Sequence, residues 1–317
     1  MNNIIVLYHR ADLDGVLSGV IAKHYLSMNP LNNVCMFGAD YGDNLKELNL
    51  NQYDKIYVLD FSDNWLLTHP ILSKKVIWID HHISAIDKKY KVNQYCINGV
   101  AACRLVYQYF TNDTASFLTD QSFYMRQVNE PYIVALTGEY DIWDQTSPIA
   151  LFVNKAINDL SFNNIEFIYN QLRFIQCPRG FESKSLDKEY IANNKKNEKD
   201  GFDLLFHYVN KGEGAIDFIR STSQTLGGGV KINLLGKIGR AFNTHIRSSL
   251  IHKQSKDEDF TMVWCYNGNS MIKVSLYSET IDVSAIASQF GGGGHRGAAG
   301  FSVMPHILTK ILTVGYP

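Results

Sequence analysis

Short runs of apolar, mostly β-branched residues alternate with amphipathic stretches between residues 1 and 80. Four such runs predict buried strands: Ile4–Tyr8, Val34–Phe37, Lys55–Leu59 and Lys75–Ile79. After the first run, residues 15–28 place apolar side chains at helical spacing, and Ser62–His69 predicts a short crossover helix. This strand–helix–strand rhythm indicates a parallel sheet with helices on both faces.

The rest of the chain has a different character. Helical spacing predicts further helices at Val100–Phe110 and at Pro131–Glu139, which begins with a proline at a first-turn position. Residues 184–203 are charged and poor in apolar groups, so they form either a solvated helix or a linker. Beyond them, glycine-rich turns flank apparent strands at Thr261–Tyr266 and Met271–Leu276.

We therefore predict an α/β protein with two domains. Residues 1–183 form the domain with the parallel sheet, residues 184–210 form a charged linker, and residues 211–317 form a smaller α/β domain with a mixed sheet. A chain of 317 residues is long enough for this division.

Composition and charge exclude several classes of protein. Hydrophobic residues make up 45% and charged residues 19% of the chain, as in an ordinary globular protein. The net charge of -1 provides no strong field for binding long nucleic acid or an anionic membrane. The five cysteines are widely spread without a CxxC pair, which favours a reducing compartment over a disulfide framework. Because no apolar run approaches the ~20 residues that span a bilayer, and the apolar start is too short for a signal peptide, we predict a cytoplasmic protein.

Acidic residues and histidines follow several of the predicted elements. They are His9, Asp12 and Asp14 in HRADLDG, Asp60 in VLDFSD, Asp80, His81 and His82 in WIDHH, and Asp141 or Asp144 in GEYDIWD. In open parallel sheets, ligands gather beyond the carboxyl ends of the strands. We therefore expect these side chains to meet at one rim of the sheet.

Each of these groups has a structural explanation when it is taken alone. DxDG is a common turn signal, and an aspartate after a strand often caps the next helix, an alternative that stays open for Asp60. Together, however, several carboxylates on one rim would repel strongly unless a cation neutralised them. The mixture of carboxylates and imidazoles suits divalent manganese or a similar ion better than calcium, and the ligands suffice for two ions that share a carboxylate.

The order of these motifs resembles the DHH superfamily of phosphoesterases: HxxDxDG, an acid at a strand end, DHH, and a distal acid before a tryptophan. The segment FGGGGHRGAAG, residues 290–300, is similar to the glycine-rich signature of the DHH-associated domain in one subfamily, the nano-RNase and pAp phosphatase-like enzymes. Together the motifs cover nearly the whole chain, whereas a GGGGH loop alone also resembles a module of alanyl-tRNA synthetases. The last acid of the family precedes "xW", so the resemblance favours Asp141 over Asp144.

The resemblance implies a site with two manganese ions, for which cobalt or magnesium are substitutes. The metal ligands that it implies are His9 and Asp12 for one ion, Asp14, His81 and Asp141 for the other, and Asp60 as the bridge. It also implies catalytic roles for Asp60, for Asp80, which orients the neighbouring histidine, and for His82, which faces the scissile phosphate.

The glycine-rich segment is the second half of the predicted site. The resemblance assigns substrate binding to Gly292, Gly293, Gly294, His295 and Arg296. Consecutive glycines let backbone N–H groups approach an anion, and a helix starting after them would add a favourable dipole. The alternative is a flexible surface hairpin, which the small residues after the loop disfavour. Tyr277 stands where many relatives carry an arginine that reaches the substrate, and a tyrosine cannot supply that charged fork.

We thus expect a manganese-dependent phosphoesterase that hydrolyses short nucleotides. By resemblance, the candidate substrates are short oligoribonucleotides, pAp, and cyclic or linear dinucleotides. The expected partner is a small nucleotide or a short single-stranded oligonucleotide rather than a membrane or a long duplex, and a homodimer is left open. The alternatives are a non-catalytic nucleotide sensor that retains the fold, which the complete ligand set disfavours, and a phosphatase for another small phosphorylated compound.

Overall fold

The computed structural model describes residues 1–111, 129–142, 148–177, 191, 202–225, 229–244, 258–266 and 271–316. The chain forms two compact units, Met1–Gly214 and Ala215–Pro317, and helix α10 (Phe202–Thr225) crosses the boundary between them. Most of the predicted linker lies outside the described residues, and its last part is helical because it belongs to α10. The functional division into domains stays a prediction.

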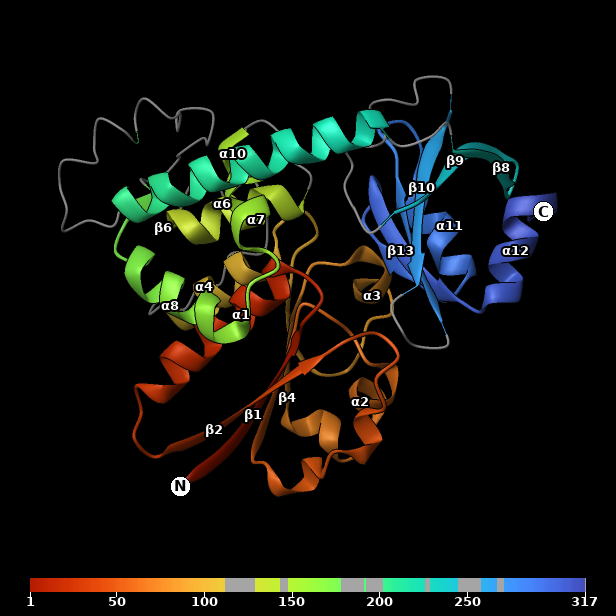
Figure 1. Ribbon diagram of the computed structural model, residues 1–317. Coiled ribbons are helices and arrows are strands. Elements are labelled where there is room, and N and C mark those ends of the chain that lie inside the picture. The colour runs from red at the N-terminus through yellow and green to blue at the C-terminus, as the bar shows by residue number, and fades with distance from the viewer. Residues whose placement is uncertain are drawn as a thin grey trace. The chain divides into compact units, whose positions relative to one another are not determined.

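The first unit contains a five-stranded sheet in which all neighbouring strands are parallel, as predicted (Figure 1). Its strands are β1 (Asn2–His9), β2 (Asn32–Ala39), β3 (Lys55–Leu59), β4 (Val76–Asp80) and β5 (Asn93–Cys96), in the spatial order β2-β1-β3-β4-β5. The chain steps outward from β1 to β2 and then returns to the other side of β1, so the strand order reverses between β1 and β3. In open α/β sheets, this switch point is where a ligand crevice opens beyond the strand ends.

Alternate side chains of the strands face two separate apolar cores, because successive residues of a strand point to opposite faces. Ile4 and Val6 of β1 belong to one core and Ile5 and Leu7 to the other. The first core is covered by the beginning of α10 and by α1 (Leu13–Ser27), α4 (Ala102–Thr111), α6 (Tyr132–Asp141), α7 (Pro148–Ile157) and α8 (Phe162–Leu172). The second core is covered by α2 (Asn64–Thr68), α3 (Ile83–Ile86) and the 3-10 turns at Leu45–Glu47, Leu50–Gln52 and Leu72–Lys75. Helices therefore flank both faces of the sheet, which confirms the predicted fold class.

Pro131 differs from its predicted place in the first turn of a helix. Its backbone is extended, with φ -58° and ψ 143°, and it is the N-cap of α6. It also lies in the short strand β6 (Glu130–Pro131), which pairs with β7 (Gln176–Cys177). The fixed φ of proline is compatible with both settings, so sequence alone did not distinguish them.

The second unit contains a six-stranded mixed sheet, again as predicted, in the order β12-β13-β11-β10-β9-β8. Its strands are β8 (Val230–Leu234), β9 (Lys237–Asn243), β10 (Phe260–Tyr266), β11 (Ile272–Tyr277), β12 (Gly293–Gly294) and β13 (Ala298–Val303). Only the pairing of β9 with β10 is parallel among the described strands of this sheet. Helices α11 (Val283–Gln289) and α12 (Pro305–Val314) pack on its apolar core, which includes Phe260 and Phe301. None of the described helices in either unit combines the length and the apolar character that a membrane crossing requires.

A buried ion pair joins two elements beside the first core. Arg104 of α4 and Glu130 of β6 are 4% and 2% exposed, and the guanidinium group donates to the carboxylate. Residue 138 of α6 is glycine because a Cβ there would lie 2.3 Å from the Arg104 side chain. A buried charge is costly unless it is paired, so this contact fixes α4 against its neighbours.

We predict that Glu130→Ala lowers the free energy of unfolding by about 3 kcal/mol, because it leaves the Arg104 charge buried without this partner. Denaturant unfolding measures the change. The matched control is Glu166→Ala, which removes the more exposed ion pair with Lys23 and should cost less than about 1 kcal/mol. Equal losses in the two variants would contradict the role given to burial.

Candidate metal centre

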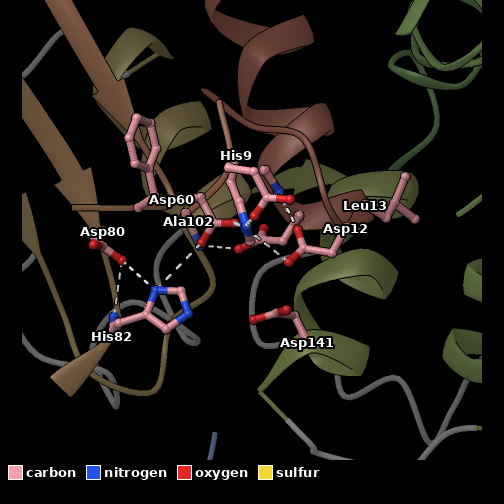
Figure 2. A network of polar contacts seen from close by, with 12 residues as sticks. His9, Asp12, Leu13, Asp60, Asp80, His82, Ala102 and Asp141 are labelled. Atoms are coloured by element: carbon pink, nitrogen blue, oxygen red, sulfur yellow. Dashed lines mark hydrogen bonds and ion pairs between the residues drawn. The ribbon is translucent and has the colours of Figure 1, made fainter. Parts of the chain in front are cut away.

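The predicted ligands of the first unit gather at the carboxyl ends of β1, β3 and β4, on both sides of the switch point. Figure 2 shows the side chains of His9, Asp12, Asp60 and Asp141 turned toward one region, with His82 beside it. Asp14, Asp60, Asp80 and His81 are each 3% exposed or less. The sheet therefore brings acids and imidazoles together at a rim where four of them are almost fully buried.

The loop after β1 carries the first ligands and begins α1. Asp12 is the N-cap of α1, and its Oδ1 accepts a hydrogen bond of 3.0 Å from the N–H of Gly15. Its other oxygen, Oδ2, lies 3.2 Å from Nδ1 of His9. Gly15 belongs to the helix rather than to a turn, and a Cβ at this position would lie 2.2 Å from the His9 carbonyl oxygen. The glycine of DxDG is thus required by the close approach of α1 to the end of β1.

Asp14 is held by the amino-terminal end of α4. Its two oxygens accept hydrogen bonds of 2.8 Å from the backbone N–H groups of Ala102 and Cys103. These are N–H groups that a helix cannot satisfy internally, and the helix dipole favours a negative charge there. The carboxylate is fixed from behind, and its Oδ2 lies 3.6 Å from Nε2 of His81.

Asp60 lies between the other ligands and has an unusual backbone conformation. Its φ is 62°, in the left-handed region that non-glycine residues seldom adopt. Its Oδ2 lies 3.5 Å from Nδ1 of His9, and its Oδ1 lies 3.4 Å from Nε2 of His81. Such backbone strain is typical of functional positions. The alternative role of Asp60 as the cap of the next helix is wrong, because Asp63 is the N-cap of α2.

His81 and Asp141 complete the group on the β4 side. Nε2 of His81 lies 3.2 Å from Oδ2 of Asp141, the last residue of α6. Asp144 lies outside the described residues. The structure therefore brings Asp141 to the rim, where the sequence placed one of these two acids.

The Asp80 side chain contacts the ring of His82, the second residue after it. Its Oδ1 accepts backbone N–H groups of His81 and His82 at 2.7 and 3.1 Å and lies 2.7 Å from Nδ1 of the His82 ring. Burial lowers the pKa of His82, but the Asp80 carboxylate outweighs it and raises that pKa to about 9. The Asp80 carboxylate therefore favours the positively charged form of the His82 ring. Figure 2 shows this ring beside the cluster of ligands.

The pKa values of the acids record their crowding. Burial, then the charge of Asp60, raises the pKa of Asp14 to about 7. Burial, then Asp12, raises the pKa of Asp60 to about 6, and burial with Asp14 raises the pKa of Asp141 well above its ordinary value. Burial acts in the same direction on Asp12, but His9 outweighs it and lowers the Asp12 pKa. Ionising these carboxylates together near neutral pH is therefore costly, and a cation among them would lower that cost.

The donor atoms fit divalent metal ions. His9, Asp12 and Asp60 form one group, and Asp14, Asp60 and His81 form another, each with ligand atoms within 4.8 Å of one another. Neighbouring donors lie 3.2–3.6 Å apart, which is the spacing of atoms that each lie about 2.1 Å from one ion. Asp60 Oδ1 is buried and accepts no hydrogen bond from the described residues. Asp60 contributes one oxygen to each group, as a bridging ligand would.

The sequence prediction missed Asp40, which follows β2 at the same rim. Asp40 Oδ1 lies 3.5 Å from Nε2 of His9. The strand-end rule that identified Asp60 applies to this residue as well. The predicted strand ended at Phe37, whereas β2 continues to Ala39, so the acid was not counted as a strand-end residue.

The glycine-rich segment of the second unit is a helix end followed by a hairpin. Gly291 has φ 76°, and the N–H groups of Gly291 and Gly292 donate to the carbonyl oxygens of Ser288 and Ala287, which terminates α11. The expected helix after the glycines is wrong, because β12 and β13 follow them. Glycine at 292 avoids a Cβ that would lie 2.1 Å from the Gly300 oxygen.

Around this hairpin, several N–H groups that an anion would need are already used. Those of Gly292 and His295 donate within the protein, the latter to Ala298 at 2.8 Å. Arg296 is exposed, and Tyr277 is paired in register with Ala298, directly beside the loop. The substrate-binding roles of Gly292, Gly293, Gly294, His295 and Arg296 stay predictions, and they rest on side chains more than on these amides.

Comparison with known proteins gives distant relatives over almost the full chain. No family model matches the sequence. The oligoribonuclease NrnB of Bacillus subtilis (strain 168) is 24% identical over 344 residues, covering 95% of this chain and 73% of that protein. The uncharacterized protein R106 of Acanthamoeba polyphaga mimivirus is 24% identical over 327 residues, covering 94% and 67%. Among solved structures, the pGpG-specific phosphodiesterase PggH of Vibrio cholerae is 11% identical, covers 98% of this chain and 96% of its own, and has a TM-score of 0.43.

We predict that Asp60→Asn stabilises the metal-free protein at pH 8 by about 2 kcal/mol, because Asn tolerates the left-handed backbone and removes a buried carboxylate. The raised pKa of Asp60 means that its protonated form stabilises the fold at low pH, and this contribution is lost as pH rises through about 6. The gain should therefore vanish near pH 4. Urea unfolding in the presence of a chelator measures it.

The control for this experiment is Asp54→Asn, an exposed acid at the opposite end of β3. It should give no pH-dependent gain. If Asp60→Asn were instead less stable than the wild type at pH 8, the Asp60 carboxylate would stabilise the fold itself and would not be explained as a ligand held ready for a cation.

Proposed function

We propose that the chain is a phosphoesterase of the DHH superfamily, which its sequence motifs resemble, and that it hydrolyses short oligoribonucleotides or dinucleotides with two manganese ions. The observation that carries the proposal is the Asp60 carboxylate, whose two oxygens face different groups of ligand atoms. The substrate class is supported by the relative NrnB, which is named an oligoribonuclease. A net charge of -1 agrees with a small substrate rather than long nucleic acid.

In this proposal, His9 and Asp12 hold one ion, and Asp14, His81 and Asp141 hold the other, with Asp60 between them. The ions, when bound, activate water as the nucleophile and polarise a phosphoryl oxygen. Cobalt or magnesium are candidate substitutes for manganese.

The protein's own residues provide the rest of the chemistry. The charged His82 ring, with Nδ1 held by Asp80, presents its remaining nitrogen to the phosphoryl oxygens and stabilises the negative charge that develops there. Asp80 keeps that charge in place without touching the substrate. The glycine-rich hairpin binds the phosphate or sugar through His295 and Arg296, and Tyr277 offers a ring for stacking or a hydroxyl in place of an arginine.

We expect hydrolysis to stop when the protein is treated with a chelator and dialysed, and to return on addition of manganese. The substrate panel consists of short oligoribonucleotides, pAp, linear and cyclic dinucleotides, and a sugar phosphate without a base. Turnover of the nucleotides alone supports the proposal, and preferred turnover of the sugar phosphate supports the alternative of a different small substrate. Nucleotide binding without turnover of any compound would establish the sensor, and full activity in chelator would refute the metal mechanism.

The proposal assigns metal binding to residues of the first unit and substrate binding to residues of the second, which gives a further prediction. His295→Ala should retain both ions by elemental analysis but lose roughly 10-fold or more in kcat/KM on a dinucleotide, the effect of one charge-assisted hydrogen bond. An activated phosphodiester that needs little recognition should lose less. His306→Ala, which changes an exposed histidine on α12 of the same unit, is the matched control and should behave like the wild type. Loss of metal from His295→Ala, or unchanged kcat/KM, would contradict the binding role.

A further inference from the structure

Asp40 lies behind the candidate metal ligand His9 as a consequence of sheet topology. β2 is parallel to β1, and Ala39 is paired in register with His9. The next residue of β2, Asp40, therefore emerges at the same rim, and its Oδ1 lies 3.5 Å from Nε2 of the His9 ring. The other ring nitrogen, Nδ1, faces Asp12 and Asp60 at 3.2 and 3.5 Å. The two nitrogens of His9 thus face different carboxylates on opposite sides of the ring.

The Asp40 carboxylate is held in place by its own loop. Its Oδ1 accepts the N–H of Tyr41 at 2.8 Å, and the N–H of Asp40 donates to Oδ2 of Asp43 at 2.9 Å. Arg10 braces the loop from the β1 side through an ion pair of 3.1 Å with Asp43 and a hydrogen bond of 2.9 Å to the Gly38 oxygen. Little conformational freedom remains to be lost when the carboxylate orients an imidazole.

Two other contacts restrict the His9 ring. The Tyr41 ring lies edge-on to it, with centroids 5.4 Å apart and an interplanar angle of 69°. At the base of the side chain, α1 approaches the carbonyl oxygen and the Cβ of His9 so closely that only glycine fits at position 15. These contacts limit how the His9 side chain can turn, and Asp40 faces one of its two ring nitrogens.

We infer that Asp40 is a positioning residue that accepts the Nε2–H of His9 and keeps Nδ1 available as a metal donor. Metal-binding histidines usually donate their second N–H to a carboxylate or a carbonyl, which fixes the tautomer and increases the donor strength of the metal-facing nitrogen. The inference deepens the proposed function and rests on the metal site proposed there. It adds a residue that touches neither substrate nor ion and acts only through His9.

The test compares manganese binding to purified Asp40→Asn and Asp43→Asn proteins, measured by the electron paramagnetic resonance signal of free manganese during titration. Asp40→Asn keeps an oxygen for the Tyr41 N–H but loses the negative charge facing His9. We expect it to weaken manganese affinity about 10-fold or more. Asp43→Asn disturbs the same loop and its Arg10 brace without facing His9, so its affinity should stay at the wild-type value. Nitrogen-15 NMR of the metal-free His9 ring, recorded at a pH high enough for the ring to be neutral, should show a proton on Nε2 in the wild type and a mixture of tautomers in Asp40→Asn.

The outcomes separate this inference from the proposed function. Wild-type protein that binds no manganese refutes the metal site, and the inference falls with it. Wild-type binding with unchanged affinity in Asp40→Asn refutes only the role of Asp40. Equal weakening in both variants means that the loop as a whole matters and that the carboxylate does not position His9.

Discussion

The repulsion among buried carboxylates at the end of one parallel sheet is the constraint around which the first unit is organised. Asp60 is 1% exposed, in a left-handed backbone conformation, with both oxygens facing other ligand groups. Such a residue costs stability through strain and through desolvation. The cost is consistent with a site for cations, because a cation converts the same repulsion into attraction.

Backbone groups and a second layer of acids hold this arrangement. The amino-terminal end of α4 donates two N–H groups to Asp14, and α4 itself is fixed by the buried pair of Arg104 and Glu130. Asp80 uses one oxygen for two backbone N–H groups and the His82 ring. The ligands therefore cannot relax apart to relieve their repulsion, because each is tied to a rigid element. The geometry of the site thus depends on elements that are distant in sequence. Asp14 lies in α1, for example, and Ala102, whose N–H it accepts, lies in α4.

The sequence predicted the parallel sheet and most of its strands because hydrophobic runs of β-branched residues are local signals. It also predicted which residues meet at the rim, since parallel strands bring their carboxyl ends together. Asp40 was missed because β2 is an edge strand whose side chains are only partly buried, so its apolar run ends before the strand does. The glycine run was expected to bind an anion ahead of a helix, but its first two residues, Gly291 and Gly292, terminate a helix. A run of glycines is compatible with either arrangement, so the sequence does not distinguish them. The sequence does not reveal that Arg104 is buried, because its burial depends on tertiary packing and an arginine on a helix is usually exposed.

The two candidate ion sites differ in how they compete with protons. On the β1 side, Asp12 favours the charged form, whereas His9 holds a proton because Asp12, with Asp40 and Asp60, outweighs the effect of burial and raises its pKa well above the ordinary value. On the β4 side the order is reversed, because burial and the His82 charge lower the pKa of His81 to about 4 while the pKa of Asp14 rises to about 7. In the proposed two-ion site, an ion on the β1 side would displace a proton from an imidazole, and an ion on the β4 side would displace protons from carboxylic acids. Both kinds of proton release are favoured as the pH rises. A cation on the β4 side would also offset the repulsion between Asp14 and Asp60, whose oxygens face both groups of ligands. In the proposed two-ion site, a cation on either side would lower the electrostatic cost of ionising Asp60, because its two oxygens face the two groups of ligands.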